Sequence, residues 1–313
     1  MINSDVIVIT GPTATGKSAL GASVAKKLGG EVVSADSMQV YKHMDIGTAK
    51  PTEQEMLGIP HHMFDVVSPM EDYSVSRYVE DAARCIDDII ARGKLPVLVG
   101  GTGLYIESLL SGRWFSPRGQ EDLRDLRTEL EERYDRTGGE DMLAEMRGFD
   151  AQSAARLHAN DKKRIVRAFE IYKTSGKTIS QHDRETQIVT PRYSSTKVAL
   201  NYLQRSALYG RIERRVDDML AAGFSIEVQS LLDMGVPIKS TAMQAIGYKE
   251  LASAITGKSA MDETVGLIKQ RSRNYAKRQL TWFRRDESIN WIYWEKSPDI
   301  ELAVSVISNL LQA

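Results

Sequence analysis

Residues 6–18 read VIVITGPTATGKS, and this stretch decides the fold. An apolar run of strand length leads into the pattern Gly-x-x-x-x-Gly-Lys-Ser, and a helical stretch follows as far as Leu28. Gly11 and Gly16 permit backbone angles that a Cβ atom forbids, so successive N–H groups can converge on one anion. This pattern in this context predicts a phosphate-binding loop at the end of a buried strand.

Every residue of this loop is an expected phosphate or nucleotide contact: Gly11, Pro12, Thr13, Ala14, Thr15, Gly16, Lys17 and Ser18. The helix that follows directs the positive end of its dipole at the anion. The Lys17 ammonium adds a mobile charge, and the Ser18 hydroxyl can ligate the Mg²⁺ that accompanies a diphosphate. The loop alone leaves open whether the ligand is a nucleoside triphosphate or another diphosphate ester.

Strand-like segments alternate with helical segments on both sides of a long helical middle. The strand candidates are residues 5–10, 31–36, 95–101, 197–203 and 289–294, and the helix candidates include 18–28, 74–91, 208–222 and 265–284. This alternation favours βαβ units, and we expect an α/β fold in which a P-loop-containing parallel sheet is flanked by helices. Residues 1–115 and 187–313 would form this core. Residues 116–186 read as an all-helical insertion domain, with one helix starting after Asp161 and ending at Gly176.

The composition excludes several classes of protein. The 313 residues include 41 Lys and Arg against 42 Asp and Glu, so a nucleic-acid partner must be sought in local charge patterns. The single cysteine, Cys85, cannot form an internal disulfide and fits a reducing compartment. No segment approaches the about 18 apolar residues of a membrane span. We therefore expect a cytoplasmic protein without a membrane partner, and nothing in the sequence indicates a protein partner.

Two further motifs stand where the second and third predicted strands end. Asp36 opens the segment DSMQVY, and Thr102 lies in the segment GGTGLY. Ligands of parallel sheets bind at the carboxyl ends of the strands, so both residues should share a rim with the phosphate loop. The Asp36 carboxylate suits either a turn-forming cap or a general base or Mg²⁺ partner. The third strand ends in glycines instead of the acidic residue of P-loop ATPases, and we expect these glycines to admit a bulky substrate.

The sequence resembles the tRNA dimethylallyltransferase family, whose members attach a five-carbon prenyl group to the adenosine beside the anticodon. The matching blocks run in family order over nearly the whole chain: residues 11–18, 36–41, 44–52, 58–62, 93–105, 161–172, 244–250 and 277–284. The resemblance implies dimethylallyl diphosphate as the donor and Mg²⁺ as its companion. It implies the N6 amine of an adenosine in the anticodon stem-loop of tRNA as the acceptor.

The resemblance also implies roles for single residues. Asp36 would accept a proton from the amine, and Thr102 would bind the diphosphate or the reacting groups. Arg211 is a candidate for a second cation on the diphosphate, with a solvated helix arginine as the alternative reading. The insertion domain, residues 116–186, is expected to contact tRNA. The single residues expected to contact tRNA are Asp36, Ser37, Met38, Gln39, Thr102, Arg124, Lys163, Arg164, Arg167, Lys277 and Arg278.

Two local patches of basic residues favour an RNA partner. Residues 269–285 contain seven Lys or Arg and no acid, interleaved with aromatic residues, and six more cations lie within residues 162–177. Seven charges without a counter-ion exceed what solubility requires, and basic and aromatic side chains bind phosphates and unpaired bases. Two other functions stay open. A free-nucleotide isopentenyltransferase would need neither patch, and a P-loop ATPase or kinase would use the loop without a prenyl donor.

Overall fold

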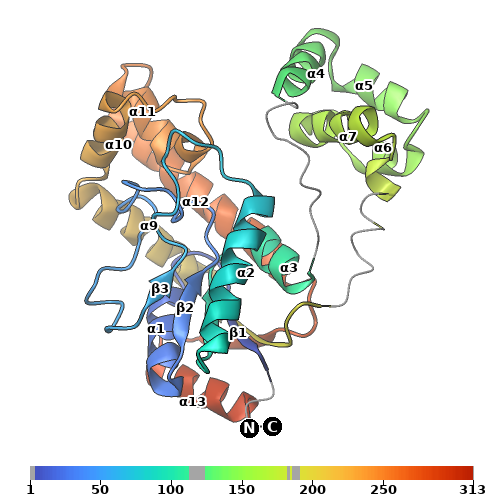
Figure 1. Ribbon diagram of the computed structural model, residues 1–313. Helices are drawn as coiled ribbons and strands as arrows, with labels where there is room; N and C mark the ends of the chain where they lie inside the picture. Colours follow the sequence, from blue (N-terminus) through green and yellow to red (C-terminus); the bar gives the residue numbers. More distant parts are fainter. Residues whose placement is uncertain (1–3, 113–123, 182–183, 185–190, 313) are drawn as a thin grey trace. The chain divides into compact units, whose positions relative to one another are not determined.

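The computed structural model describes residues 4–112, 124–181, 184 and 191–312, and the chain divides into two compact units. The first unit comprises residues 1–110 and 191–313, and the second comprises residues 111–190. The first unit contains a parallel sheet with helices around it, and the secondary structure described for the second unit is helical (Figure 1). The predicted fold class is thereby confirmed.

The first unit is built from two stretches of chain. The first stretch provides β1 (Val6–Thr10), α1 (Lys17–Leu28), β2 (Glu31–Ser34), β3 (His61–His62), α2 (Val75–Ala91), β4 (Pro96–Val99) and α3 (Gly103–Leu110). The second stretch provides β5 (Ser195–Tyr202), α9 (Arg205–Ala221), α10 (Phe224–Asp233), a 3₁₀ turn (Ala242–Gln244), α11 (Tyr248–Ile255), α12 (Met261–Phe283), β6 (Asn290–Trp294) and α13 (Ile300–Leu310).

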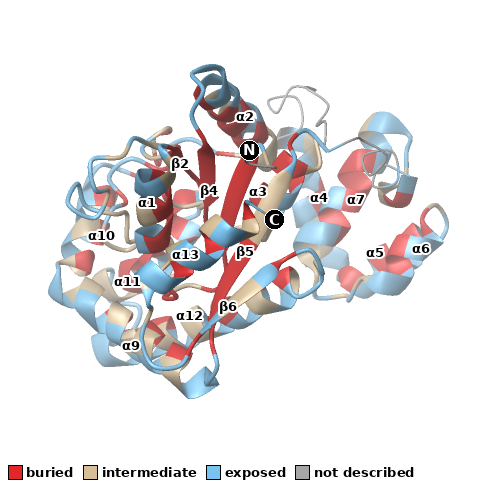
Figure 2. Cartoon of the chain, turned by 90° about the horizontal axis from the view of Figure 1, so that it is seen from below, coloured by how far each residue is buried: buried red, intermediate tan, exposed pale blue. Residues whose placement is uncertain are grey.

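Six strands form the sheet in the order β3-β2-β4-β1-β5-β6, and all neighbours are parallel. The strand β1 lies between β4 and β5, where Ile9 pairs with Val99 and with Val198. The strands β1, β2 and β4 are buried along their whole length, whereas the helices keep exposed sides (Figure 2). Continuous apolar strands of this kind are typical of a parallel sheet covered on both faces.

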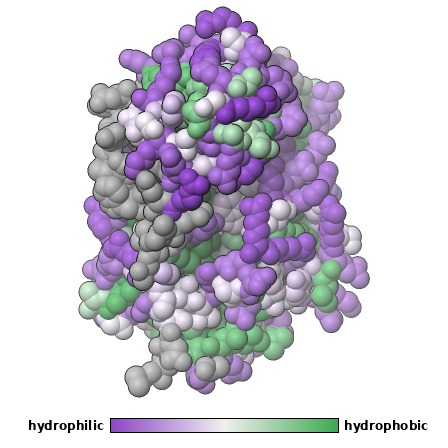
Figure 3. Space-filling model, turned by 90° about the vertical axis from the view of Figure 1, so that its right-hand side faces the viewer, coloured by the Kyte–Doolittle hydropathy of each residue, from purple (hydrophilic) through white to green (hydrophobic). Residues whose placement is uncertain are grey.

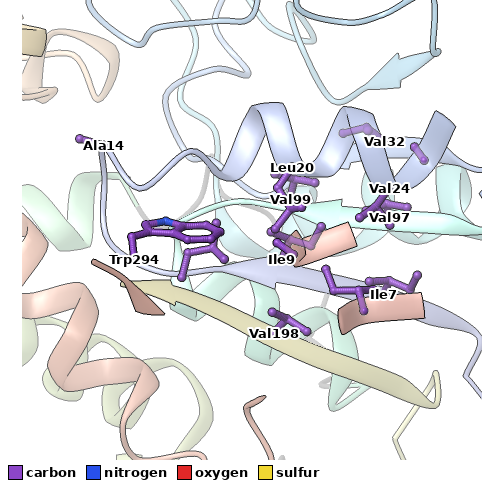
Figure 4. Packing of buried hydrophobic residues seen from close by; sticks show 14 of the residues in the cluster. Ile7, Ile9, Ala14, Leu20, Val24, Val32, Val97, Val99, Val198 and Trp294 are labelled. Atoms are coloured by element: carbon purple, nitrogen blue, oxygen red, sulfur yellow. The ribbon is translucent and has the colours of Figure 1, made fainter. Parts of the chain in front are cut away.

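Apolar side chains fill the space between the sheet and its helices. On one face, alternate residues of the strands pack against α1 and α13, with Ile7 and Ile9 facing Leu20 and Val24 (Figure 4). The helices α2 and α3 pack together over the other face, where α2 lies against β2 and β4. This core fixes the carboxyl ends of the strands, from which the functional loops leave.

The predicted strands are all present, and their ends differ from the expected ones by at most two residues. The strand β3 was not predicted because its two residues, His61 and His62, are too short for a periodic pattern. The helices α9 and α12 begin three and four residues earlier than predicted, at Arg205 and Met261.

The second unit has a small core of its own. It contains α4 (Arg124–Thr137), α5 (Gly139–Met146), α6 (Ala151–Arg156) and α7 (Lys162–Ser175). Leu130, Met142 and Phe169 are among its fully or almost fully buried residues. The helix α7 follows Asp161 and ends at Gly176, whose φ of 68° is the left-handed conformation that favours glycine, so the predicted bounds are confirmed.

Apolar residues are scarce on the surface of the molecule in one view. Figure 3 shows a face on which hydrophilic residues predominate and apolar residues form small, separate patches. Among the helices of the described residues, none is long and apolar enough to cross a membrane.

Cys85 lies half-buried on α2, with its thiol 3.9 Å from the sulfur of Met63.

A buried carboxylate lies at the start of β2, at the end of the sheet opposite the P-loop. The Glu31 side chain is 2% exposed and accepts hydrogen bonds from Arg92 at 2.8 Å and from Lys94 and His62 at 2.7 Å. The Arg92 guanidinium is the main cause that holds the pKa of Glu31 far below its usual range, although burial opposes this effect. The cluster ties β2 to β3 and to the segment that follows α2.

We expect Glu31→Gln to lower the free energy of unfolding by about 1–3 kcal/mol at pH 7, because the bonds to its basic partners weaken. The pKa of Glu31 is lowered by folding, so its stabilising effect is complete above about pH 4.3, the ordinary value, and is lost as the pH falls below it. Urea unfolding at pH 7 and pH 3 measures both effects. Glu80→Gln, an exposed carboxyl on α2, is the control, and equal losses in the two variants would contradict the prediction.

Candidate active site

The P-loop, residues 11–18, joins β1 to α1. Gly11 has a φ of 128° and lies so close to β5 that an added Cβ would overlap the carbonyl oxygen of Leu200. Gly16 precedes α1 with a φ of 87°, in the left-handed region. Both glycines are therefore required by backbone geometry, which is what the motif predicted.

Two buried side chains from the end of the chain hold the P-loop. The amide of Gln279, on α12, accepts the N–H of Thr13 at 2.9 Å and donates to the carbonyl oxygen of Gly101 at 2.9 Å. Trp294, on β6, donates its indole N–H to the carbonyl oxygen of Thr15 at 2.9 Å (Figure 4). Neither contact was predicted, because no local pattern relates these residues to the loop.

Two arginines of α9 reach the P-loop. The Nε atom of Arg211 donates to the carbonyl oxygen of Ala14 at 3.3 Å, and Nη1 of Arg215 donates to the hydroxyl of Thr13 at 3.3 Å. The two lie one helical turn apart and therefore on the same side of the helix. Arg211 thus lies beside the loop, although its bond to a diphosphate stays a prediction. Arg215 was not among the predicted site residues. Its position four residues after Arg211 on a predicted helix was the signal in the sequence that could have identified it.

Lys17 lies half-buried at the end of the loop and lines the cavity beside it. Its Nζ atom donates to the carbonyl oxygen of Pro12 at 2.7 Å. Burial lowers the pKa of Lys17 to about 7, the nearby Arg215 lowers it further, and the Asp36 carboxylate opposes both. Near neutral pH, the lysine is therefore ready to take up a proton when an anion approaches.

The loops that follow β2 and β4 meet beside the P-loop. The Oδ1 atom of Asp36 accepts the N–H groups of Met38 at 2.8 Å and Gln39 at 3.4 Å, and no described residue bonds its Oδ2 atom. The hydroxyl of Thr102 accepts the N–H of Ser37 at 3.1 Å. One oxygen of Asp36 therefore shapes the turn, as the capping reading expected. The other oxygen has no partner among the described residues, and its use as a general base or Mg²⁺ partner stays a prediction.

Gln39 was expected to contact tRNA, but its amide already has protein partners. The side chain is buried, and its Oε1 atom accepts from the hydroxyl of Ser34 at 3.0 Å. Its Nε2 atom donates to the carbonyl oxygens of Thr48 and Ala49, both at 3.2 Å. The structure thus gives Gln39 a supporting role in the loop that carries Asp36, and because the residue also lines the cavity, its contact with tRNA stays a prediction.

The glycines after β4 line the cavity, so the expectation that they admit a substrate stays a prediction, but the structure also gives them another role. A Cβ atom added to Gly100 would overlap the backbone of Ala35, and one added to Gly101 would overlap the amide of Gln279. The position that a side chain of either residue would take is therefore filled by the protein itself. These glycines allow two loops and α12 to approach one another.

Most of the P-loop, the segment 36–39, Arg211, Arg215 and Gln279 line one cavity of about 780 Å³ within the first unit. Thr102 is not among the lining residues, so its bond to the diphosphate or the reacting groups stays a prediction. Its polar lining includes Lys17, Ser18, Asp36, Arg211 and Arg215. Apolar side chains of α9, α10 and the segment before α11 form other walls: Ile212, Val216, Met219, Phe224 and Ile246. No cluster of three or more His, Cys, Asp or Glu that could hold a metal occurs in the described residues. Cationic and apolar walls together suit an anion attached to a hydrocarbon.

The basic residues of α12 fall into two groups. Lys269, Arg271 and Arg273 each pair with a carboxylate of another helix, so the expectation of seven charges without counter-ions was wrong. Lys277 and Arg278 are exposed and have no ion pair in the described part of the chain, and Arg278 also lines the cavity. Only the second group leaves its charge available to a phosphate.

The four candidate tRNA contacts of the second unit also differ in whether their charge is paired with a carboxylate. Arg124 begins α4, but its side chain lies outside the described residues. Lys163 and Arg164 are exposed on α7, and within residues 124–181 they have no acidic partner. Arg167 is also exposed but donates to the buried Glu170 at 2.7 Å. Their contact with tRNA stays a prediction.

Comparison with known families and proteins agrees with this site. The model of the family described as IPP transferase matches residues 39–286, and the model described as isopentenyl transferase matches residues 4–67. The chain belongs to the IPP transferase family. This membership confirms the resemblance that the motifs predicted.

Relatives of this IPP transferase family member span nearly its whole length. The tRNA dimethylallyltransferase of Caldanaerobacter subterraneus subsp. tengcongensis is 46% identical over 290 residues, which cover 92% of this chain and 91% of that protein. The tRNA isopentenylpyrophosphate transferase of Bacillus halodurans is 38% identical, with a TM-score of 0.72 and coverage of 98% and 96%. A eukaryotic dimethylallyltransferase acting on tRNA is 31% identical, with a TM-score of 0.83 and coverage of 98% and 79%.

We expect the affinity for inorganic diphosphate to fall about tenfold between pH 6 and pH 8 as Lys17, with its pKa of about 7, loses its proton. In Lys17→Arg the guanidinium stays charged, so the fall should be smaller. Titration calorimetry at each pH measures the affinity, and two buffers of different ionisation enthalpy reveal the proton taken up. Because the ligand's own titration affects both proteins equally, parallel pH profiles would refute the role of Lys17.

Proposed function

We propose that this protein transfers a dimethylallyl group from dimethylallyl diphosphate to N6 of the adenosine 3′-adjacent to the anticodon in tRNA, releasing diphosphate. The observation that carries the proposal is that the P-loop and the Asp36 carboxylate line the same cavity. The names of the relatives, tRNA dimethylallyltransferase and dimethylallyltransferase acting on tRNA, support it.

Asp36 is the proposed proton acceptor. In the transfer, a bond forms between N6 and the first carbon of the allyl chain while the bond from that carbon to the diphosphate oxygen breaks. The amine is conjugated to the purine ring and is a weak nucleophile, so it needs an acceptor for the proton that it loses during attack. The Oδ2 atom of Asp36, which no described residue bonds, is suited to take this proton.

The P-loop holds the leaving group in this mechanism. Negative charge grows on the diphosphate as its bond to carbon breaks, so fixed donors stabilise the transition state more than the ground state. The loop N–H groups, Lys17, Arg211 and Arg215 would supply them. The Ser18 hydroxyl, exposed in the first turn of α1 and lining the cavity, fits one oxygen ligand of Mg²⁺ shared with the diphosphate, which would neutralise part of this charge. The apolar walls would hold the allyl chain and exclude water.

The acceptor base must leave its stack to reach Asp36. An adenine inside an anticodon loop cannot enter a cavity unless it is turned outward. Ser37 and Met38 line the cavity beside Asp36 and would contact the turned base. Exposed cations beside the cavity and on α7 would bind the RNA backbone. We also propose that the reaction takes place in the cytoplasm, where the protein would meet its tRNA substrate.

We expect Asp36→Asn to lower turnover by about 10²–10⁴-fold while tRNA affinity changes by less than about twofold, because the amide keeps the turn but cannot take the proton. Mass spectrometry of unmodified tRNA incubated with dimethylallyl diphosphate and Mg²⁺ measures turnover, and filter binding measures affinity. The control is Asp262→Asn, an exposed carboxyl in the first turn of α12.

Three results would count against the proposal. Wild-type protein that prenylates AMP but not tRNA would be a free-nucleotide isopentenyltransferase. Steady phosphate release from ATP without a prenyl donor would indicate an ATPase or kinase. A large loss of tRNA affinity in Asp36→Asn would show that this carboxylate positions the RNA instead of accepting a proton.

The two groups of cations on α12 provide a matched test of RNA binding. We expect Lys277→Ala to weaken tRNA binding and to reduce the slope of log affinity against log salt by about 0.7–0.9, the loss of one phosphate contact. Lys269→Ala should leave the slope nearly unchanged, because the Lys269 ammonium is already paired with Asp217. Binding isotherms at several salt concentrations measure both slopes, and equal changes would refute the assignment.

A further inference from the structure

One side chain of α10 holds a wall of the cavity. Three residues of the segment 45–49 line the cavity. The Glu227 carboxylate accepts three successive backbone N–H groups of this segment: Asp45 and Ile46 donate to Oε2 at 2.7 Å each, and Gly47 donates to Oε1 at 3.0 Å. Successive N–H groups that converge in this way form an anion-binding concavity, and here a protein carboxylate occupies it.

The Glu227 carboxylate receives a fourth hydrogen bond. The hydroxyl of Tyr248, on α11, donates to Oε1, and burial and then the Glu227 charge hold the pKa of Tyr248 far above its usual range. The same segment is also packed closely, because a Cβ added to Gly47 would overlap the ring of Phe224. The four donors need two oxygen atoms that only accept hydrogen bonds. A carboxylate provides both, whereas an amide of the same shape has only one such oxygen and cannot replace it.

This segment reaches Asp36 through one further residue. Thr48 and Ala49 present their carbonyl oxygens to the Nε2 atom of Gln39, both at 3.2 Å. The backbone N–H of Gln39 in turn donates to the Oδ1 atom of Asp36 at 3.4 Å. A continuous set of contacts therefore runs from Glu227 through the wall segment to the carboxylate that is proposed to accept the proton.

We propose that Glu227 is a positioning residue for the transfer reaction. It holds the segment 45–49 in the conformation that fixes Gln39, and through Gln39 it orients the Asp36 carboxylate towards the acceptor amine. The inference rests on the proposed function. Glu227 acts on the acceptor side of the cavity, whereas the donor is held by the P-loop, which none of these hydrogen bonds involves. Loss of Glu227 should therefore affect the chemical step more than the binding of the donor.

The test is Glu227→Gln, which keeps the shape of the side chain but turns an NH₂ group towards a donor. We expect kcat to fall about tenfold or more, while the KM for dimethylallyl diphosphate changes by less than about threefold. Gln229→Ala, on an exposed position of the same helix, is the matched control and should keep both constants. Tyr248→Phe removes one donor of the four and should lower kcat by about two- to fivefold, so it carries the test if Glu227→Gln does not fold.

A double-mutant cycle with Asp36→Asn separates positioning from general destabilisation. If Glu227 acts through Asp36, Glu227→Gln should change single-turnover rates by less than about twofold when Asp36 is already Asn. Independent losses that multiply, an unchanged kcat, or a loss confined to the KM for the donor would each overturn the inference. Wild-type protein that does not prenylate tRNA would instead refute the proposed function, so the two failures are distinguishable.

Discussion

The side-chain amide of Gln279 connects the loops that leave two neighbouring strands, β1 and β4. Its oxygen accepts a hydrogen bond from the N–H of Thr13, and its nitrogen donates one to the carbonyl oxygen of Gly101. The Gln279 side chain is buried, and its bond to Gly101 is buried as well, so without this amide the carbonyl of Gly101 would lose its partner. The P-loop is consequently held in shape by contacts within the protein. Donors fixed in this way need no reorganisation when charge develops on a leaving group.

The parts of the fold and site that could be predicted from the sequence are those with local signals. The left-handed angles of Gly11 and Gly16, the apolar runs of the strands and the end of α7 at Gly176 each follow from a few adjacent residues. The supports of the P-loop have no such signal. Gln279 and Trp294 contact residues that lie 266 and 279 positions away in the chain, and only the folded sheet brings them together.

Two features of the site that the sequence-based predictions missed have a related cause. A run of cations on a helix shows where charge lies, but its counter-ions can stand on other helices, as Asp217 does for Lys269. A glycine shows that space is needed, but the atoms that fill the space can belong to the protein, as those of Gln279 do beside Gly101. In both cases the missing information is the identity of a neighbour distant in sequence, which composition and periodicity do not contain.

The support of the P-loop by α12 and β6 has a consequence for folding during synthesis. The ribosome releases the phosphate-binding motif well before the residues that hold it in shape, because Gln279 and Trp294 follow their partners in the loop by 266 and 279 positions. The strand β1 likewise gains its neighbour β5 only after the whole second unit has been translated. A nascent chain therefore carries the motif long before it carries the side chains that fix the shape of the loop.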